Sequence, residues 1–490
     1  MKAFKRNQIK NIINEEIKMN RYSYDDLIFS GAISLCNIIL KQNIEEVLII
    51  SGNNYNGDIG IALANTLIKK TSIKPLLVHF NLSSRRFSEL LDEKVEVIDD
   101  VRKTVKIIET NIYIVDCMFG YDLSESIYYP FNYLIDKIND SNCYVLSCDV
   151  PSGINSDNGC VDRSTIKADG TVVLQLIKPG YYLYPASSYT GKLFVDNIGI
   201  SHQVIEDAST DIFVNYLREI KEMIPQRIKH SHKMNYGKVL LIAGSEGKIG
   251  ASLLCGSTIM KTGAGYLTVL SYPEVIQVFN NQLIEALTET FDVYNIRYQM
   301  ENNFDFCRYS LIVIGPGLGV NSSTEYLVRR VLETDIPVVI DADGLNYLKN
   351  NLDLLKRDAL TVITPHLGEF KRTFVYNQEI IIDDLQRYTN SFPNLAIVLK
   401  GEHTLIAYKG QVTINTTGNN ALAKAGSGDV LCGIISGFLA QKCDIESIVA
   451  AVYIHSLAAD YWCINNSQYS LLATDLIKMI DRILKQLTSR

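Results

Sequence analysis

Two glycines and an aspartate stand directly before a long apolar segment in the stretch GSGDVL, residues 426–431. Glycines let backbone amides approach an anion closely, and the first turn of a helix offers unpaired N–H groups and the positive end of the helix dipole. The pattern therefore predicts a phosphate-binding turn followed by a helix from about Val430. We expect Asp429 to stay ionised there and to accept a proton from a substrate hydroxyl that attacks phosphorus. The alternative is that Asp429 only caps the helix.

Four β-rich apolar runs in the C-terminal half end in clusters of small or polar residues. The clusters are IAGS at 242–245, GPGLG at 315–319, DADGLN at 341–346 and TPHLGEF at 364–370. In an open parallel sheet, ligands bind beyond the carboxyl ends of the strands, so we expect the four clusters to converge on one crevice. Asp341 and Asp343 are alternatively interpreted as simple caps at the end of a strand.

The elements that must position these clusters alternate along the chain. From residue 45, short apolar runs such as EVLIISG and NIYIVDC alternate with helical patterns, including predicted helices near 84–93 and 130–139. Such alternation favours parallel sheets with helices on both faces. The alternation is interrupted near 200–236, where a helix is predicted near 212–223. It resumes with the strand pattern KVLLIAGSEG and a predicted helix at 250–263. At 490 residues the chain exceeds one ordinary core, so we predict two three-layer α/β domains, 1–222 and 226–490.

Composition excludes several classes of partner. The net charge of -7 comes without a long basic run, which argues against nucleic acid and against an anionic membrane surface. Ten cysteines without a C-x-x-C pair argue against a zinc site and a disulfide framework. No run reaches the roughly 18 apolar residues needed to span a bilayer, and the N-terminus has no signal-peptide core. We therefore expect a cytoplasmic protein that binds small molecules.

The C-terminal motifs carry a family resemblance. AKAGSGDVLCGIISGFLAQ resembles the signature of ribokinase-like small-molecule kinases. SHKMNYGKVLLIAGSEGKIGA, GPGLG, DADGLN, TPHLGEF and VLKGEHTLIA together resemble the nucleotide-dependent NAD(P)H-hydrate dehydratase, over about 226–488. The resemblance implies that hydrated NADH or NADPH is phosphorylated on its added hydroxyl and then loses phosphate, with ADP or ATP as donor and Mg²⁺ as cofactor.

The resemblance also implies roles for individual residues. Asp429 would be the base and contact the substrate, with Gly428 beside the anion. The hydrated nicotinamide would contact Ala251, Gly317 and His366, although His366 is equally interpreted as a structural histidine. Glu369 would lie near the metal and phosphates, or would simply start a helix. The nucleotide would be held by Lys400, Gly401, Glu402, His403 and Thr404.

The N-terminal half resembles the NAD(P)H-hydrate epimerase domain, which interconverts the two stereoisomers of the hydrate. The similarity lies in VDCMFG at 115–120, DVPSGINSDNG at 149–159 and KADGTVVLQLIKPGYYLYP at 167–185. It implies that Asp149 contacts the substrate and transfers the proton, unless Asp149 only caps a turn. A potassium ion would bind Asn56, Asp116 and Ser152, which carry hard oxygen ligands. The substrate would also contact Tyr55, Asn56, Gly57, Asp58 and Ile59.

Departures from the epimerase pattern leave alternatives open. In GNNYNGDIG, residues 52–60, Tyr55 and Ile59 replace an asparagine and an aspartate of the family, and Asp58 replaces a glycine. Tyr121 and Asp122 replace a threonine and a glycine, and a carboxylate there would repel pyrophosphate. The N-terminal half is therefore either an epimerase or a non-catalytic binding or oligomerisation module. A vitamin-precursor kinase is the alternative for the C-terminal half. We expect a homo-oligomer.

Overall fold

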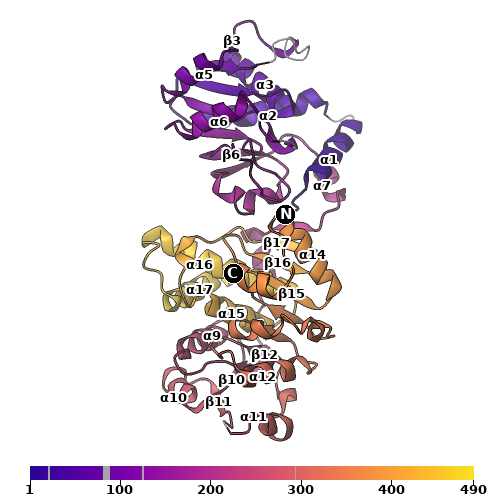
Figure 1. Cartoon of the computed structure of the whole chain (residues 1–490), viewed down its shortest axis with the longest axis vertical. Helices are drawn as coiled ribbons and strands as arrows, with labels where there is room; N and C mark the ends of the chain where they lie inside the picture. Colours follow the sequence, from indigo (N-terminus) through magenta and orange to yellow (C-terminus); the bar gives the residue numbers. More distant parts are fainter. Residues whose placement is uncertain (20–21, 81–88, 124–125, 293, 490) are drawn as a thin grey trace. The chain divides into compact units, whose positions relative to one another are not determined.

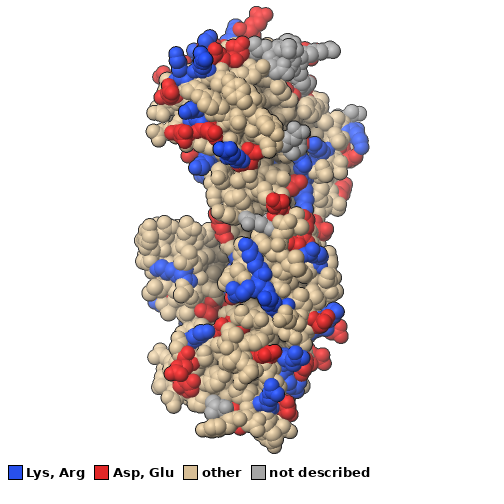
Figure 2. Space-filling model, in the orientation of Figure 1, with Lys and Arg blue, Asp and Glu red and all other residues tan. Residues whose placement is uncertain are grey.

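The computed structural model of the chain describes residues 1–490 except 20–21, 81–88, 124–125, 293 and 490 (Figure 1). The chain divides into two compact units, Lys2–Ile212 and Phe213–Arg490, with Met1 grouped with the second unit. Each unit is built on its own sheet. On the face drawn in Figure 2, basic and acidic side chains of the described residues are interspersed rather than gathered by sign.

The described residues of the first unit form a seven-stranded parallel sheet in the order β3-β2-β1-β4-β5-β6-β7. Its central strands β4, β5 and β6 are buried over their whole length, as expected for strands that are covered on both faces. The strands are β1 (Glu46–Ser51), β2 (Lys74–Val78), β3 (Glu96–Ile98), β4 (Tyr113–Cys117), β5 (Val145–Cys148), β6 (Gly170–Leu174) and β7 (Lys192–Asp196).

Helices cover both faces of this sheet. Leu48 of β1 belongs to one core cluster with Ile108 of α5 and Leu134 of α6, whereas Ile49, which points the other way, lies against Gly60 of α3. The predicted three-layer arrangement is therefore confirmed, and α6 confirms the helix predicted near 130–139. The helix predicted near 84–93 lies largely outside the described residues. The helices are α1 (Arg6–Lys18), α2 (Tyr24–Ile39), α3 (Tyr55–Lys70), α5 (Val101–Ile108), α6 (Phe131–Asn139) and α7 (His202–Asp207).

The second unit holds a sheet whose described strands number ten, in the order β11-β10-β9-β12-β13-β14-β15-β16-β17-β8. Pairing is parallel from β11 to β15, and β16 pairs antiparallel with β15 and β17. The strands are β8 (Ile212–Val214), β9 (Lys238–Ile242), β10 (Tyr266–Ser271), β11 (Leu287–Thr290), β12 (Leu311–Ile314), β13 (Val338–Ile340), β14 (Thr361–Ile363), β15 (Leu395–Leu399), β16 (Leu405–Tyr408) and β17 (Gln411–Ile414).

One sequence expectation fails at the start of this unit. The helix predicted near 212–223 is wrong in its first part, because residues 212–214 form strand β8 and the helix begins only at Leu217. The predicted helix at 250–263 is confirmed as α9. The helices are α8 (Leu217–Met223), α9 (Ile249–Lys261), α10 (Pro273–Gln282), α11 (Ile296–Tyr298), α12 (Ser322–Leu332), α13 (Leu367–Thr373), α14 (Ile381–Ser391), α15 (Ser427–Leu439), α16 (Ile445–Asn465) and α17 (Ala473–Thr488).

Helices α9, α15, α16 and α17 share one apolar core with the sheet. Small residues let α15 lie directly on α9, since a Cβ on Gly433 would come within 2.5 Å of Thr258 Cβ. Among the described residues, α16 alone is long and apolar enough to span a membrane, and 72% of its apolar window is buried. The expectation that the chain has no such segment is thereby corrected. The burial of α16 is that of a core helix.

Candidate active sites

The strand-end clusters of the second unit converge as predicted. Strands β9, β12, β13, β14 and β15 are neighbours and run in parallel, so their carboxyl ends lie along one edge of the sheet. The clusters touch each other there. A Cβ on Gly315, which has a φ of +121°, would come within 1.9 Å of the Asp341 carbonyl oxygen. Only glycine fits this close approach of two strand-end turns.

Asp429 lies in the first turn of α15, which begins at Ser427 after Gly426 in a left-handed conformation. The Lys400 ammonium is close to this turn, because a Cβ on Gly428 would lie 3.6 Å from Lys400 Nζ. Burial, together with the negative charge of Asp341, raises the pKa of Asp429 to about 6, while Lys400 opposes the shift. The expectation that the helix start stabilises the ionised form of Asp429 is therefore wrong, since loss of hydration outweighs the favourable contacts, but Asp429 is still mainly ionised above pH 6.

A buried network connects three strand ends behind Asp429. Lys400 Nζ donates to Asp341 Oδ1 at 2.9 Å, and Thr364 Oγ1 donates to the same oxygen at 2.7 Å. Burial alone would lower the pKa of Lys400, but the carboxylates of Asp341 and Glu369 outweigh it and raise that pKa. Asp341 makes no side-chain cap of the turn that follows it, so the interpretation as a cap is wrong. Its carboxylate instead holds the lysine in its charged form.

His366 and Glu369 start helix α13. His366 Nδ1 accepts from the Gly368 and Glu369 N–H groups at 2.9 and 3.2 Å, and Glu369 Oε2 accepts from His366 N at 2.8 Å. Both residues thus have the structural role that the sequence left open, while the His366 side chain is still 55% exposed. Gly317 is buried beside Ala251, since a Cβ on Gly317 would come within 3.1 Å of the Ala251 Cβ.

A cavity of about 430 Å³ adjoins the start of α15. All five residues of the predicted nucleotide segment, Lys400 to Thr404, line it together with Gly428. Sequence reasoning missed His455, whose Nε2 lies 2.9 Å from the Ser427 carbonyl oxygen. Burial lowers the pKa of His455 to about 4, so its ring is neutral. A histidine inside the apolar run of α16 gives no sequence signal, whereas the Gly-Asn-Asn turn at 418–420, which also lines the cavity, was detectable.

The first unit has its own polar cluster at the ends of β4 and β5. The Asp116 carboxylate accepts from Ser152 Oγ at 2.6 Å, Ser152 N at 2.8 Å, Ser147 Oγ at 2.9 Å and Met118 N at 3.1 Å. Burial raises the pKa of Asp116, and none of the described cations pairs with it. Asn56 donates to the Cys148 carbonyl oxygen at 2.7 Å. The structure therefore gathers the three predicted potassium ligands around one pair of strand ends.

Asp149 is paired with a residue that sequence reasoning did not single out. Its carboxylate accepts from Leu174 N at 3.1 Å and forms a buried ion pair with Lys178. Burial lowers the pKa of Lys178, and the charge of Asp149 opposes that change. The backbone of Asp149 has a φ of +61°, a strained conformation for a side-chain-bearing residue. The only signal in the sequence was a single lysine inside the apolar run LQLIKPGYY.

The altered loop 52–60 forms the start of helix α3. Asn54 caps the helix by accepting from Gly57 N at 3.0 Å, and a Cβ on Gly57 would collide with the Gly52 carbonyl oxygen at 1.9 Å. The buried Tyr55 hydroxyl has no hydrogen-bond partner among the described residues. Its pKa is raised by burial and by the charge of Asp149, which places the phenol near that carboxylate.

The remaining predicted residues of this half divide between surface and core. Asp58 is half-buried in the first turn of α3, whereas Ile59 is fully buried against Gly31 of α2 and does not join the polar group. Tyr121 is buried, whereas Asp122 is exposed and pairs with Lys10 at 2.6 Å. The negative charge of Asp122 is thus partly neutralised at the surface.

Comparisons with known proteins found matches for both halves of the chain. A family model described as NAD(P)H-hydrate dehydratase matches residues 239–482, and one described as YjeF-related protein N-terminus matches 26–180. The ADP/ATP-dependent NAD(P)H-hydrate dehydratase of Bacillus subtilis, solved with ATP and Mg²⁺, is 33% identical with a TM-score of 0.51. The similarity covers 57% of this chain and 100% of the Bacillus subtilis chain. A ribokinase-like superfamily protein from Enterococcus faecalis is 28% identical, with a TM-score of 0.51, over 57% of this chain and 97% of its own. The C-terminal unit thus has a ribokinase-like fold.

Two curated relatives extend the similarity over both units. The bifunctional NAD(P)H-hydrate repair enzyme Nnr of Coxiella burnetii is 35% identical over 372 residues, which are 74% of each chain. Its counterpart from Dictyoglomus turgidum is 30% identical over 517 aligned residues, covering 98% of this chain and 99% of its own. The chain therefore belongs to the family of bifunctional NAD(P)H-hydrate repair enzymes.

Proposed function

We propose that the chain repairs hydrated NADH and NADPH with two activities. The C-terminal half dehydrates the S-hydrate with ADP or ATP as phosphoryl donor, and the N-terminal half interconverts the R- and S-hydrates. Relatives with this bifunctional description align along nearly the whole chain, which supports repair over a vitamin-precursor kinase and over a merely structural N-terminal module.

The position of Asp429 carries the proposal for dehydration. In the proposed reaction, Asp429 accepts the proton of the hydrate hydroxyl while that oxygen bonds to the terminal phosphorus of the nucleotide. The bond from phosphorus to the bridging oxygen breaks, so ADP would leave as AMP. Phosphate then leaves with the hydroxyl oxygen, and a proton is lost from the neighbouring ring carbon to restore the double bond. The closeness of Lys400, held charged by Asp341, to the turn at Gly428 supports this step, because its ammonium would neutralise the transferred phosphoryl group.

The side chains around this site fit a magnesium ion that is bound jointly by a carboxylate and the nucleotide phosphates better than an ion that is bound by protein side chains alone. Among the described residues, no group of three or more His, Cys, Asp and Glu side chains is arranged to hold a metal. Mg²⁺ is commonly held by one or two carboxylates together with substrate phosphates. Glu369, 4.0 Å from Lys400 Nζ, is our candidate carboxylate. When bound, the ion would neutralise phosphate charge.

For the N-terminal half, we assign proton transfer to Asp149 and place the substrate between Asp149 and the loop 52–60. The buried Tyr55 hydroxyl has no hydrogen-bond partner among the residues that the structure describes, and a polar group of the substrate would supply one, which supports a modified rather than an abolished site. Asn56, Asp116 and Ser152 provide oxygen ligands, and a cation would offset the buried charge of Asp116. The fit therefore supports K⁺ at these residues. On the family resemblance, we also propose a cytoplasmic homo-oligomer, which light scattering would test for oligomeric state.

The purified full chain with ADP, Mg²⁺ and a mixture of R- and S-hydrates separates the two activities. Complete clearance of both epimers supports the whole proposal. Arrest after the S-hydrate is consumed refutes epimerisation, and no clearance refutes dehydration. Asp149→Asn and Asp429→Asn form a matched pair of isosteric variants. The first should arrest clearance at the R-hydrate, and the second should stop dehydration while the epimers still exchange.

A further inference from the structure

The loop after strand β17 forms part of the wall of the nucleotide cavity. Thr417, Gly418 and Asn419 of this loop line the cavity together with the segment from Lys400 to Thr404. The loop is irregular, so its shape depends on hydrogen bonds other than those of a helix or a sheet ladder. The groups that provide those bonds therefore determine the position of this part of the cavity wall.

Asn215 supplies several of these bonds from the end of strand β8. Its side chain is 2% exposed, and both ends of its amide are used. Asn215 Oδ1 accepts from Thr416 N at 3.1 Å, and Nδ2 donates to Asn415 Oδ1 at 3.2 Å. The Asn215 backbone takes part as well, because its carbonyl oxygen accepts from Thr416 Oγ1 at 2.8 Å and its N–H donates to the Ile414 carbonyl oxygen at 3.2 Å.

Asn415 connects Asn215 to two parts of the wall of the nucleotide cavity. It is 1% exposed, and its N–H donates to the Thr404 carbonyl oxygen at 2.9 Å. Its carbonyl oxygen lies 3.0 Å from His403 Nδ1, and its amide Nδ2 donates to the Thr417 carbonyl oxygen at 2.9 Å. His403, Thr404 and Thr417 all line the cavity. One buried asparagine therefore contacts the His403 ring and the backbone carbonyls of both Thr404 and Thr417.

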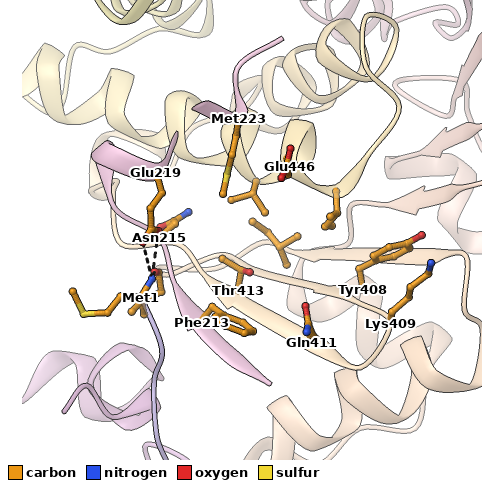
Figure 3. A pocket seen from close by; sticks show the side chains of 14 residues that line it. Met1, Phe213, Asn215, Glu219, Met223, Tyr408, Lys409, Gln411, Thr413 and Glu446 are labelled. Carbon is orange, nitrogen blue, oxygen red and sulfur yellow. Dashed lines mark hydrogen bonds and ion pairs between the residues drawn. The ribbon is translucent and has the colours of Figure 1, made fainter. Parts of the chain in front are cut away.

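Asn215 itself stands outside the nucleotide cavity. It lines a different cavity of about 560 Å³, shown in Figure 3, with Thr413 and Ile406 of the neighbouring strands. Replacing Asn215 would therefore remove no direct contact between protein and nucleotide. An effect on nucleotide affinity would have to pass through Asn415 and the loop.

We propose that Asn215 is a positioning residue for the nucleotide site, which it shapes through its hydrogen bonds to residues 415–416. The inference rests on the proposed nucleotide-dependent dehydration, because the cavity must hold the nucleotide. Loss of the Asn215 amide leaves the Thr416 N–H without its partner and leaves Asn415 Oδ1 with only the 3.4 Å bond from Thr417 Oγ1, and a buried network is sensitive to such a loss. Water can enter from the adjoining 560 Å³ cavity and hydrogen-bond to some of the groups that lose the Asn215 amide. We therefore expect an effect of about tenfold on affinity rather than several hundredfold.

Calorimetric titration of the full chain with ADP and Mg²⁺ tests the inference directly. Asn215→Ala should raise the Kd for ADP about tenfold, while kcat at saturating nucleotide changes less than about twofold. The KM for the hydrate should stay the same. Thr416→Val keeps the side-chain volume but removes the hydroxyl that bonds the Asn215 carbonyl, so it should raise the Kd in the same direction by a smaller factor, and it serves if Asn215→Ala does not fold.

A matched control and a double-mutant cycle exclude a general effect on folding. Asn394 is an asparagine of the same unit that is half-buried rather than fully buried, and its amide donates to the Arg357 carbonyl oxygen at 3.0 Å. Asn394→Ala should lower Tm but leave the Kd for ADP unchanged. Asn215→Ala and Asn415→Ala should be non-additive in their effect on Kd, because each breaks the same bond.

The possible outcomes separate the two proposals. No binding of ADP by the unaltered chain refutes the proposed nucleotide-dependent function itself. Binding by the unaltered chain with the same Kd in folded Asn215→Ala or Thr416→Val overturns the positioning role alone. Strict additivity of the Asn215 and Asn415 variants, or an equal loss of affinity in Asn394→Ala, also overturns it.

Discussion

Replacing Asp341 by asparagine should shift the pH dependence of dehydration. Asp429 must be ionised to accept a proton, and its pKa of about 6 means that it becomes protonated as the pH falls through that value. Activity should therefore fall on the acid side, to about one tenth at pH 5 of its value at pH 7.5. After burial, the charge of Asp341 is the largest cause that raises this pKa, so Asp341→Asn should lower it.

The order of the causes limits the expected shift, because burial raises the pKa of Asp429 more than the charge of Asp341 does. The pKa of Asp429 lies about two units above its ordinary 3.8, and burial accounts for the largest share. We expect Asp341→Asn to move the acid limb of kcat/KM down by on the order of one pH unit. Activity at pH 5 would then be about half of that variant's own maximum rather than one tenth. The loss of the Lys400 contact should also reduce the maximum itself.

Initial rates with the S-hydrate and saturating ADP, measured from pH 4.5 to 8, would give the two profiles. Asp343→Asn is the matched control, because Asp343 also raises the pKa of Asp429 but ranks below Asp341 and Lys400 as a cause. Its acid limb should move less than that of Asp341→Asn. An unmoved limb near pH 6 in folded Asp341→Asn would refute the assignment of that limb to Asp429.

Other replacements test other parts of the two sites. Asp429→Asn should lower dehydration about 10²–10⁴-fold with ADP binding kept. Because the raised folded-state pKa of Asp429 gives stability that is lost as pH rises through about 6, this variant should gain Tm at pH 7.5 relative to the parent but not at pH 3.5. Lys178→Met leaves Asp149 as an unpaired buried charge and should cost about 3–5 kcal/mol in urea unfolding of the N-terminal unit, whereas adding Asp149→Asn should restore most of it. Gly57→Ala should prevent normal folding of that unit, seen as lost epimerisation and a lowered Tm, because its Cβ would meet the Gly52 carbonyl oxygen at 1.9 Å; an unchanged Tm would contradict the close approach.

The features that sequence predicted well are local or periodic. Apolar runs that alternate with helical patterns fixed the parallel sheets, and strand-end motifs converge simply because neighbouring parallel strands end at one edge. The turn before α15 was recognisable because its glycines and Asp429 are contiguous. The short strand β8 was missed because three residues cannot show a period of their own, and the helical pattern of 217–223 extended over them.

The features that sequence could not predict join distant residues. The Lys178–Asp149 pair spans 29 positions and the Asn215–Asn415 bond spans 200, so neither leaves a local pattern. His455 is surrounded in sequence by apolar residues, and only its contact with Ser427 connects it to the cavity. The raised pKa of Asp429 likewise depends on burial by elements far along the chain, which a motif cannot report.

Strand β8 has a practical consequence for dissecting this protein. It is the last strand of the C-terminal sheet, next to β17. A recombinant fragment begun at Gln226 would lack β8 and Asn215, leaving the backbone N–H and C=O groups on the side of β17 that faces β8 unpaired at an open edge. Such edges recruit strands from other molecules, so that fragment should self-associate. A fragment of the C-terminal unit that keeps this strand should therefore start at or before Ile212.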